Sequence, residues 1–135
     1  MDAEIQQGLV IPIEKGVKLL DRKGGRLTSF CAPSLGAITY PIGKWVGPRF
    51  YCGPLAVFDT LENTLQFIKL YYGIKNKRFL PPGYAFFNCL FIRSKYQTFW
   101  AGAAGKIHCP PFPTGTQFAD LLQLVEEIDN CTLPF

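Results

Sequence analysis

The sequence is poor in the residues on which many catalytic sites depend. It holds a single histidine, His108, and only 10 Asp and Glu among 135 residues. Any Cys–His nucleophile pair must use His108. Adjacent Cys109 cannot be its partner on a strand, because neighbouring strand side chains face opposite ways; a spatial partner such as Cys52 or Cys89 stays open. The composition therefore leans away from an enzyme, and no catalytic residue is identified.

Metal and phosphate motifs are also missing. No cysteines lie at zinc-ligand spacing, and there is no phosphate-binding G-x-x-x-x-G-K-[ST] loop and no G-x-S-x-G nucleophile elbow. Between Lys15 and Lys106 the acidic residues are Asp21, Asp59 and Glu62. Asp59 and Glu62 have the spacing of a helix-capping pair rather than of two catalytic carboxylates. We expect no metal site and no cofactor.

Long apolar runs and targeting signals are absent as well. No stretch of 18 apolar residues predicts a membrane-spanning helix, so no membrane partner is expected. The acidic start, residues 1–4, lacks the features of a signal peptide. The five cysteines are odd in number and widely spaced, which favours reduced thiols. The expected compartment is the cytoplasm.

Apolar and turn-forming residues are plentiful. Hydrophobic residues make up 48% of the chain and aromatic residues 15%, with 13 Gly and 11 Pro. Short apolar runs separated by Gly and Pro predict many strands. We expect one α+β domain over residues 1–135, with a mostly antiparallel sheet of about five to seven short strands and about two helices. Residues 1–14 are expected to form an extended arm or an edge strand.

Several elements can be placed along this frame. Residues 17–20 and 26–30 are expected to form a hairpin around a loop at 21–25. Residues 84–93 are almost wholly apolar and predict a central strand. Residues 96–100 are expected either to pair with that strand or to form a loop.

The first helix is expected over about 60–72. Asp59 is its predicted cap, Leu61, Leu65 and Ile68 recur on one face, and Gly73 is its predicted end.

A second helix is expected over about 117–128. Its residues Phe118, Leu121, Leu122, Val125 and Ile128 form an apolar stripe at helical spacing. The acidic residues Glu126, Glu127 and Asp129 then fall at its C-terminal end. That end of the helix dipole disfavours negative charge, so a basic partner is expected in the domain or on another subunit.

The charge is unevenly distributed. Residues 1–106 carry 14 basic and 6 acidic side chains, a net charge of +8, whereas residues 107–135 carry four acidic side chains and no basic one. Such asymmetry is typical of a self-complementary contact or a nucleic-acid surface. We favour a non-enzymatic protein-interaction module that self-associates as a homo-oligomer or binds a protein partner. Because the bases are scattered, nucleic acid is not the expected partner.

Aromatic and basic residues alternate over residues 40–51. Such residues stack on nucleotides or on single-stranded nucleic acid, and they are also enriched at subunit interfaces. The alternative functions are therefore a nucleotide-binding pocket around Ser29, Tyr40 and Trp45, or single-stranded nucleic-acid binding. The candidate ligand-binding residues are Ser29, Tyr40, Lys44, Trp45, Arg49 and Tyr51.

The layout of residues 17–128 resembles that of small microbial and phage domains of unknown function. The resembling segments are 27–29, 40–45, 53–58 and 113–116. Their order is also similar to the ADP-ribosyltransferase fold, and this resemblance implies that Ser29 and Tyr40 match the strand Ser and the Tyr that line a nicotinamide pocket. The catalytic Glu of that family lies on a late strand. It has no match here, because Glu126 and Glu127 fall in the expected second helix.

Overall fold

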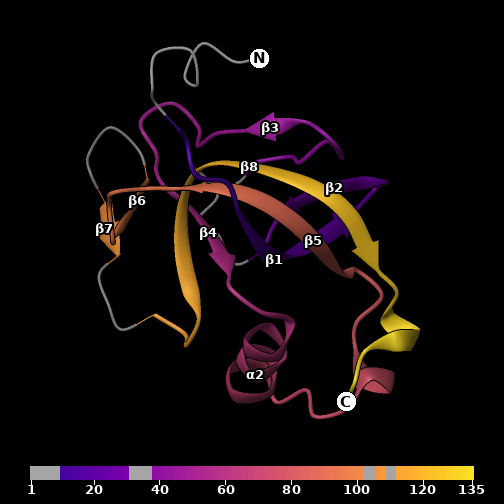
Figure 1. Ribbon diagram of the computed structural model, residues 1–135. Coiled ribbons are helices and arrows are strands. Elements are labelled where there is room, and N and C mark those ends of the chain that lie inside the picture. The colour runs from indigo at the N-terminus through magenta and orange to yellow at the C-terminus, as the bar shows by residue number, and fades with distance from the viewer. Residues whose placement is uncertain (1–9, 31–37, 102–105, 109–111) are drawn as a thin grey trace.

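A computed structural model describes residues 10–30, 38–101, 106–108 and 112–135 (Figure 1). In chain order the elements are β1 (Glu14–Lys23), β2 (Arg26–Ser29), β3 (Trp45–Val46), β4 (Leu55–Phe58), α2 (Leu61–Tyr72), η1 (Lys77–Phe79), β5 (Tyr84–Arg93), β6 (Phe99–Ala101), β7 (Lys106–His108), β8 (Thr116–Ile128) and η2 (Asn130–Thr132). The predicted α+β class with a mostly antiparallel sheet is confirmed.

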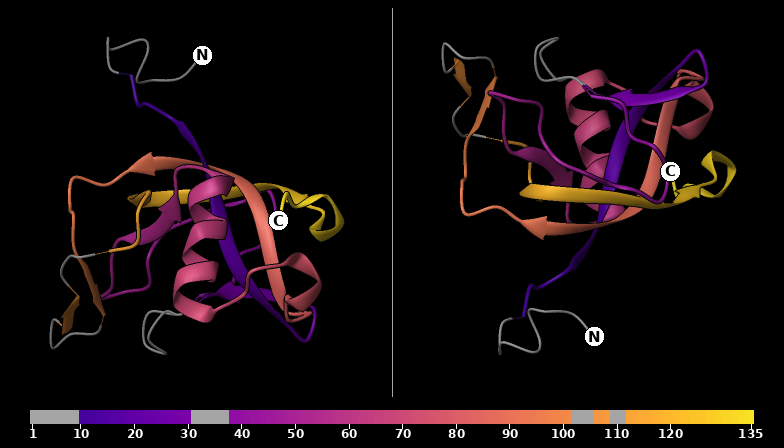
Figure 2. Two further views of the ribbon diagram at one scale, coloured as in Figure 1. Left: turned by 90° about the horizontal axis from the view of Figure 1, so that it is seen from below. Right: turned by 90° about the horizontal axis from the view of Figure 1, so that it is seen from above.

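Four strands form a closed ring of antiparallel pairings. β1 pairs with β5, β5 with β8, β8 with β4, and β4 returns to β1 through the single pair Val17–Phe58. β2 extends the sheet from β1, and β3 extends it from β8. β6 and β7 form a separate two-stranded sheet beside the ring (Figures 1 and 2). We call β1, β4, β5 and β8 the strand ring.

β5 is the central strand that the sequence predicted, and it feeds two hydrophobic clusters. Successive strand side chains face opposite sides, so Phe87 and Phe86 belong to different clusters. Phe87 packs inside the strand ring with residues from all four of its strands. Phe86 packs on the outer face with Leu65 and Ile68 of α2. Burying a phenylalanine completely stabilises the fold by about 1.5–3 kcal/mol. Because β5 contributes one buried phenylalanine to each cluster, it joins the two layers.

The helix is confirmed, with one correction at its start. α2 spans Leu61–Tyr72 and ends at Gly73, whose left-handed φ of 70° supplies the cap. The N-cap is Thr60 rather than Asp59, because the Thr60 hydroxyl accepts a hydrogen bond from the backbone N–H of Asn63 at 3.1 Å. Asp59 instead accepts a hydrogen bond from the Asn63 side chain at 2.8 Å. The helix covers the outer face of the sheet (Figure 2).

The predicted second helix is wrong, because residues 116–128 form the long strand β8. Register shifts in its pairing with β5 leave Asp120 and Val125 without a partner on that strand. Each extra residue turns the following side chains to the other face. The buried positions Ala119, Leu122 and Leu124 therefore do not follow a continuous period of two. Two bulges thus give a strand the apolar spacing of a helix.

Two smaller expectations also need correction. The β1–β2 hairpin turns on Gly24 and Gly25 alone, with φ of 56° and 78°, rather than on a longer loop. Phe99–Ala101 pair with β7 and not with β5. The segment expected to form an extended arm or an edge strand is described only in part: residues 10–13 belong to no strand and are exposed, and residues 1–9 lie outside the described residues.

Candidate functional site: an aromatic pocket beside strand β1

A cavity of about 410 Å³ opens where the edge of β1 loses its strand partner. On that edge Val17 pairs with Phe58 of β4 and Leu20 pairs with Ser29 of β2. Between them, Lys18 and Leu19 have no partner on this edge within the described strands. The volume lies within the range of small-molecule sites, about 300–1,000 Å³. We call this cavity the aromatic pocket.

One wall of the aromatic pocket is a chain of aromatic rings from three segments: α2, β4 and the residue that follows β2. Phe67 contacts Phe58, Tyr71 and Tyr72 at centroid distances of 5.4, 5.0 and 5.5 Å. Tyr72 contacts Phe30 edge-on at 5.6 Å. The helix repeat places Phe67 and Tyr71 on one face, four residues apart. Because these rings already support one another, a flat ligand meets a preformed surface.

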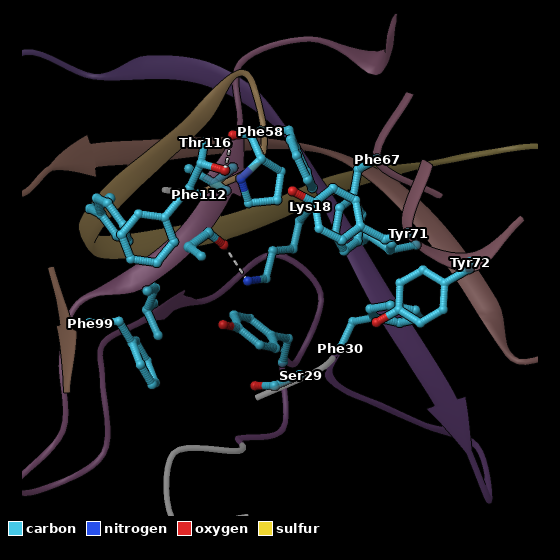
Figure 3. A pocket seen from close by; sticks show the side chains of 17 residues that line it. Lys18, Ser29, Phe30, Phe58, Phe67, Tyr71, Tyr72, Phe99, Phe112 and Thr116 are labelled. Atoms are coloured by element: carbon cyan, nitrogen blue, oxygen red, sulfur yellow. Dashed lines mark hydrogen bonds between the residues drawn. The ribbon is translucent and has the colours of Figure 1, made fainter. Parts of the chain in front are cut away.

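The opposite wall comes from later parts of the chain. Phe99 of β6, Phe112 and Phe118 of β8 line it, and the rings of Phe112 and Phe118 contact edge-on at 4.9 Å. Figure 3 shows Phe99 and Phe112 across the cavity from Phe30, Phe67 and Tyr72. The pocket therefore has aromatic side chains on two sides, brought together from segments distant in sequence.

Lys18 lies between the two walls, and only 8% of it is exposed (Figure 3). Its Nζ donates a hydrogen bond to the carbonyl oxygen of Ala56 on β4. The same Nζ lies 5.3 Å from the centroid of the Tyr40 ring, within cation–π range. An ammonium group is thus held inside an otherwise largely apolar cavity.

The serine and threonine hydroxyl groups of the lining have local partners. Ser29 Oγ accepts a hydrogen bond from the backbone N–H of Ile38 at 3.0 Å. The Thr116 hydroxyl donates to the carbonyl oxygen of Pro113 at 2.6 Å. Within the described lining there is no carboxylate and no histidine to act as a base. The chemistry that this lining offers is therefore binding through ring faces and one cation.

The six predicted ligand-binding residues separate into two groups. Ser29 and Tyr40 line the aromatic pocket. The other four are not among its lining residues: Lys44, Trp45, Arg49 and Tyr51. Trp45 is 40% exposed on the edge strand β3, and Tyr51 is 58% exposed with its ring 4.0 Å from that of Phe50. The structure thus brings Ser29 and Tyr40 to one site and leaves Trp45 outside it.

The structure corrects the expectation that Glu126 and Glu127 fall in a helix and therefore cannot match a glutamate on a late strand. Glu126 and Glu127 belong to β8, yet neither lines the aromatic pocket. The Glu127 carboxylate pairs instead with the Arg22 guanidinium at 2.6 Å. The expected basic partner for this acidic segment is therefore found in the domain itself. No helix dipole is involved.

Sequence reasoning missed the central residue of the site. Lys18 is a charged residue inside the apolar run of residues 17–20, on a strand whose neighbours are buried. Charged side chains are rarely buried without a partner. The lysine within this apolar run was therefore the feature of the sequence that could have indicated a site. Phe67, Tyr71 and Phe112 gave no comparable signal, because aromatic residues occur throughout this chain.

None of the described cysteines is among the residues that line the aromatic pocket. Cys52, Cys89 and Cys131 are not disulfide-bonded. Burial inside the strand ring raises the pKa of the Cys89 thiol to about 11, with the positive charge of Lys18 opposing that rise. A thiol with so high a pKa is a poor nucleophile at neutral pH. Cys109 lies outside the described residues, and His108 is placed only as part of β7.

No helix in the described part of the chain has both the length and the apolar character needed to cross a bilayer. Comparison with protein-family models, with curated proteins and with solved structures found no match to this chain.

Proposed function

We propose that this domain binds a small molecule with an apolar ring system in the aromatic pocket. The observation that carries the proposal is the cavity of about 410 Å³ whose two facing walls are built from aromatic rings. Stacked or edge-on ring pairs contribute about 0.5–1.5 kcal/mol beyond the area that they bury. Because the rings come from several elements already held by the fold, little ordering is needed on binding.

Ala56 offers a way to block the pocket without disturbing the core. It lines the cavity and is exposed, whereas its strand neighbours Leu55 and Val57 are buried. The substitution Ala56→Phe places a ring in the cavity. Val125→Phe is the matched control, because Val125 is 51% exposed on β8 and is not among the lining residues.

The test is titration with a neutral fluorescent naphthylamine whose emission rises in apolar surroundings. The unmodified protein and Val125→Phe are expected to bind one equivalent, and Ala56→Phe is expected to bind at least about tenfold more weakly, a change of about 1.4 kcal/mol. Equal binding by all three proteins, or no binding by the unmodified protein, contradicts the proposal. Circular dichroism establishes that both variants remain folded.

A second candidate function is association of two copies of this chain. It is favoured by an exposed strip on β8, where the apolar residues Leu121 and Val125 lie beside the acidic residues Asp120 and Glu126. The exposed basic segment at 75–78 is of complementary charge. Light scattering at low salt and high protein concentration tests this candidate. A monomeric mass under those conditions contradicts it, and dissociation by added salt supports it.

A reducing compartment, the cytoplasm, is proposed as the location. It is supported by the thiols of Cys89 and Cys131, neither of which forms a disulfide. Localisation of a fluorescently tagged chain in cells tests this proposal. Accumulation in an oxidising compartment contradicts it.

A further inference from the structure

The position of Lys18 bears on the charge of a ligand that would fit the aromatic pocket. Lys18 stands on β1 opposite Phe87 of β5, and its own backbone is held by that ladder. Its side chain is 8% exposed, and its Nζ is anchored to the Ala56 carbonyl and to the face of Tyr40. Among the described residues that are buried, Lys18 is the one that carries a formal charge.

This charge has no counter-ion in the described part of the chain. The ion pairs there join other bases to carboxylates, such as Arg22 to Glu127 and Arg93 to Glu14, each at 2.6 Å. Removing an unpaired ammonium from water is costly, and a carbonyl oxygen and a ring face offset only part of that cost. An ammonium has three donors, and the hydrogen bond to Ala56 uses one of them.

We propose that the ligand is an aromatic carboxylate whose negative group pairs with Lys18 Nζ while its rings lie between the two aromatic walls. The inference rests on the proposed binding function and adds the charge of the ligand to it. A carboxylate supplies both a counter-charge and two acceptor oxygens. A single-charge acid is favoured over a phosphate because Lys18 is the one basic residue of the described lining.

The experiment compares three ligands of the same ring size: 2-naphthoate, neutral 2-naphthamide and 2-naphthyl phosphate. Each displaces the neutral naphthylamine probe from the unmodified protein at low salt and pH 7. Naphthoate is expected to bind at least about tenfold more tightly than naphthamide, the strength of a hydrogen bond to a charged group. It is also expected to bind more tightly than the phosphate. Tighter binding of the phosphate overturns the carboxylate assignment.

Two variants assign the preference to the ammonium group. Lys18→Met keeps the length of the side chain and removes its charge, and it is expected to bring the naphthoate-to-naphthamide affinity ratio close to one. Lys18→Arg keeps the charge and is expected to keep a preference for naphthoate. A preference that survives in Lys18→Met overturns the proposal.

The outcomes separate this inference from the binding function. If naphthoate and naphthamide displace the probe equally well from the unmodified protein, the pocket binds apolar rings and the carboxylate inference is wrong. If the unmodified protein binds neither the probe nor any of the three ligands, the binding function itself is wrong. The comparison of ligands on the unmodified protein needs no variant to fold.

Discussion

The interior of the strand ring and the aromatic pocket use the same residue types to opposite effect. Inside the ring, Phe87 and Phe91 are at most 1% exposed and fill the space between four strands. In the pocket, Tyr71 and Tyr72 are 60% and 44% exposed and border a cavity. The difference follows from strand pairing, since paired strands bring their side chains together and the unpartnered edge of β1 leaves a gap. Aromatic content by itself therefore does not distinguish core from site.

The largest expected effect is a difference in the free energy of unfolding between a variant in the interior of the strand ring and a variant in the wall of the aromatic pocket. Phe87→Ala removes a phenyl group from the interior of the strand ring and is expected to lower the free energy of unfolding by about 3–5 kcal/mol. Phe67→Ala, in the half-buried pocket wall, is expected to cost about 1–2 kcal/mol. Urea denaturation of both variants measures the two losses. Equal losses would show that the pocket wall is packed as tightly as the core.

The next effect concerns the close approach of β1 to β4. A Cβ atom on Gly16 would lie 2.7 Å from the carbonyl oxygen of Phe58 and 3.0 Å from Val57 Cγ2. Gly16→Ala is therefore expected to destabilise the fold by about 1–3 kcal/mol. At Gly47 the nearest contacts would be 3.4 and 3.5 Å, so Gly47→Ala is the control and is expected to stay within about 0.5 kcal/mol. Similar thermal midpoints for the two variants would contradict this reading.

Lys18→Met makes the pocket more like the core and is expected to raise the free energy of unfolding by about 1 kcal/mol, because an unpaired charge no longer has to be buried. Denaturation in the absence of ligand measures the change. A destabilised variant would mean that the contacts of Nζ with Ala56 and Tyr40 outweigh the cost of burying the charge. If Lys18→Met is more stable than the unmodified protein and has lost the preference for naphthoate, Lys18 is identified as a ligand-binding residue.

Cys89 reports on the dryness of the ring interior. Its pKa is raised from 9.0 to about 11, so the unfolded chain ionises this thiol at a lower pH than the native protein does. The stability that Cys89 contributes is therefore intact below about pH 9 and is lost as the pH rises towards 11. At pH 8 we expect iodoacetamide to modify Cys89 at least about a hundredfold more slowly than exposed Cys131. Mass spectrometry follows the two sites, and rapid labelling of Cys89 would show that water enters the ring.

The smallest effect lies outside both regions. The Arg93 guanidinium, hydrogen-bonded to the Glu14 carboxylate, lowers the pKa of that carboxyl. The stability from this pair is thus present above the ordinary pKa of Glu14 and is lost as the pH falls through the lowered value. Glu14→Gln is expected to flatten the acid side of the stability profile slightly. Because the pair is on the surface, added salt is expected to weaken it further, and a salt-independent loss would contradict that placement.

The parts of the fold that local sequence determines were predicted well. α2 has a periodic apolar face and a glycine stop, and β5 has a continuous apolar run, so both could be placed from the sequence. β8 was mistaken for a helix because its bulges depend on the register with β5, which the sequence of β8 alone does not contain. Its Leu-rich composition then favoured the helix.

The site was predictable only in part, for a related reason. Ser29 and Tyr40 were singled out and lie in one pocket, whereas Trp45 was grouped with them by sequence proximity and lies elsewhere. The pocket exists because one stretch of β1 lacks a partner, a property of sheet topology that no local pattern encodes. Lys18, a lone charge in a buried run, was the residue from which the site could have been inferred.

The closure of the strand ring through the pair Val17–Phe58 has a consequence for motion. β5 is held by long ladders on both sides, whereas β4 is joined to β1 at this one position. A seam held by so few bonds opens locally at a lower free energy than the ladders around it. We expect amide hydrogens along this seam to exchange before those of β5. If the proposed binding function holds, a ligand would enter the aromatic pocket where β4 separates locally from β1, while β5 stays paired on both of its sides.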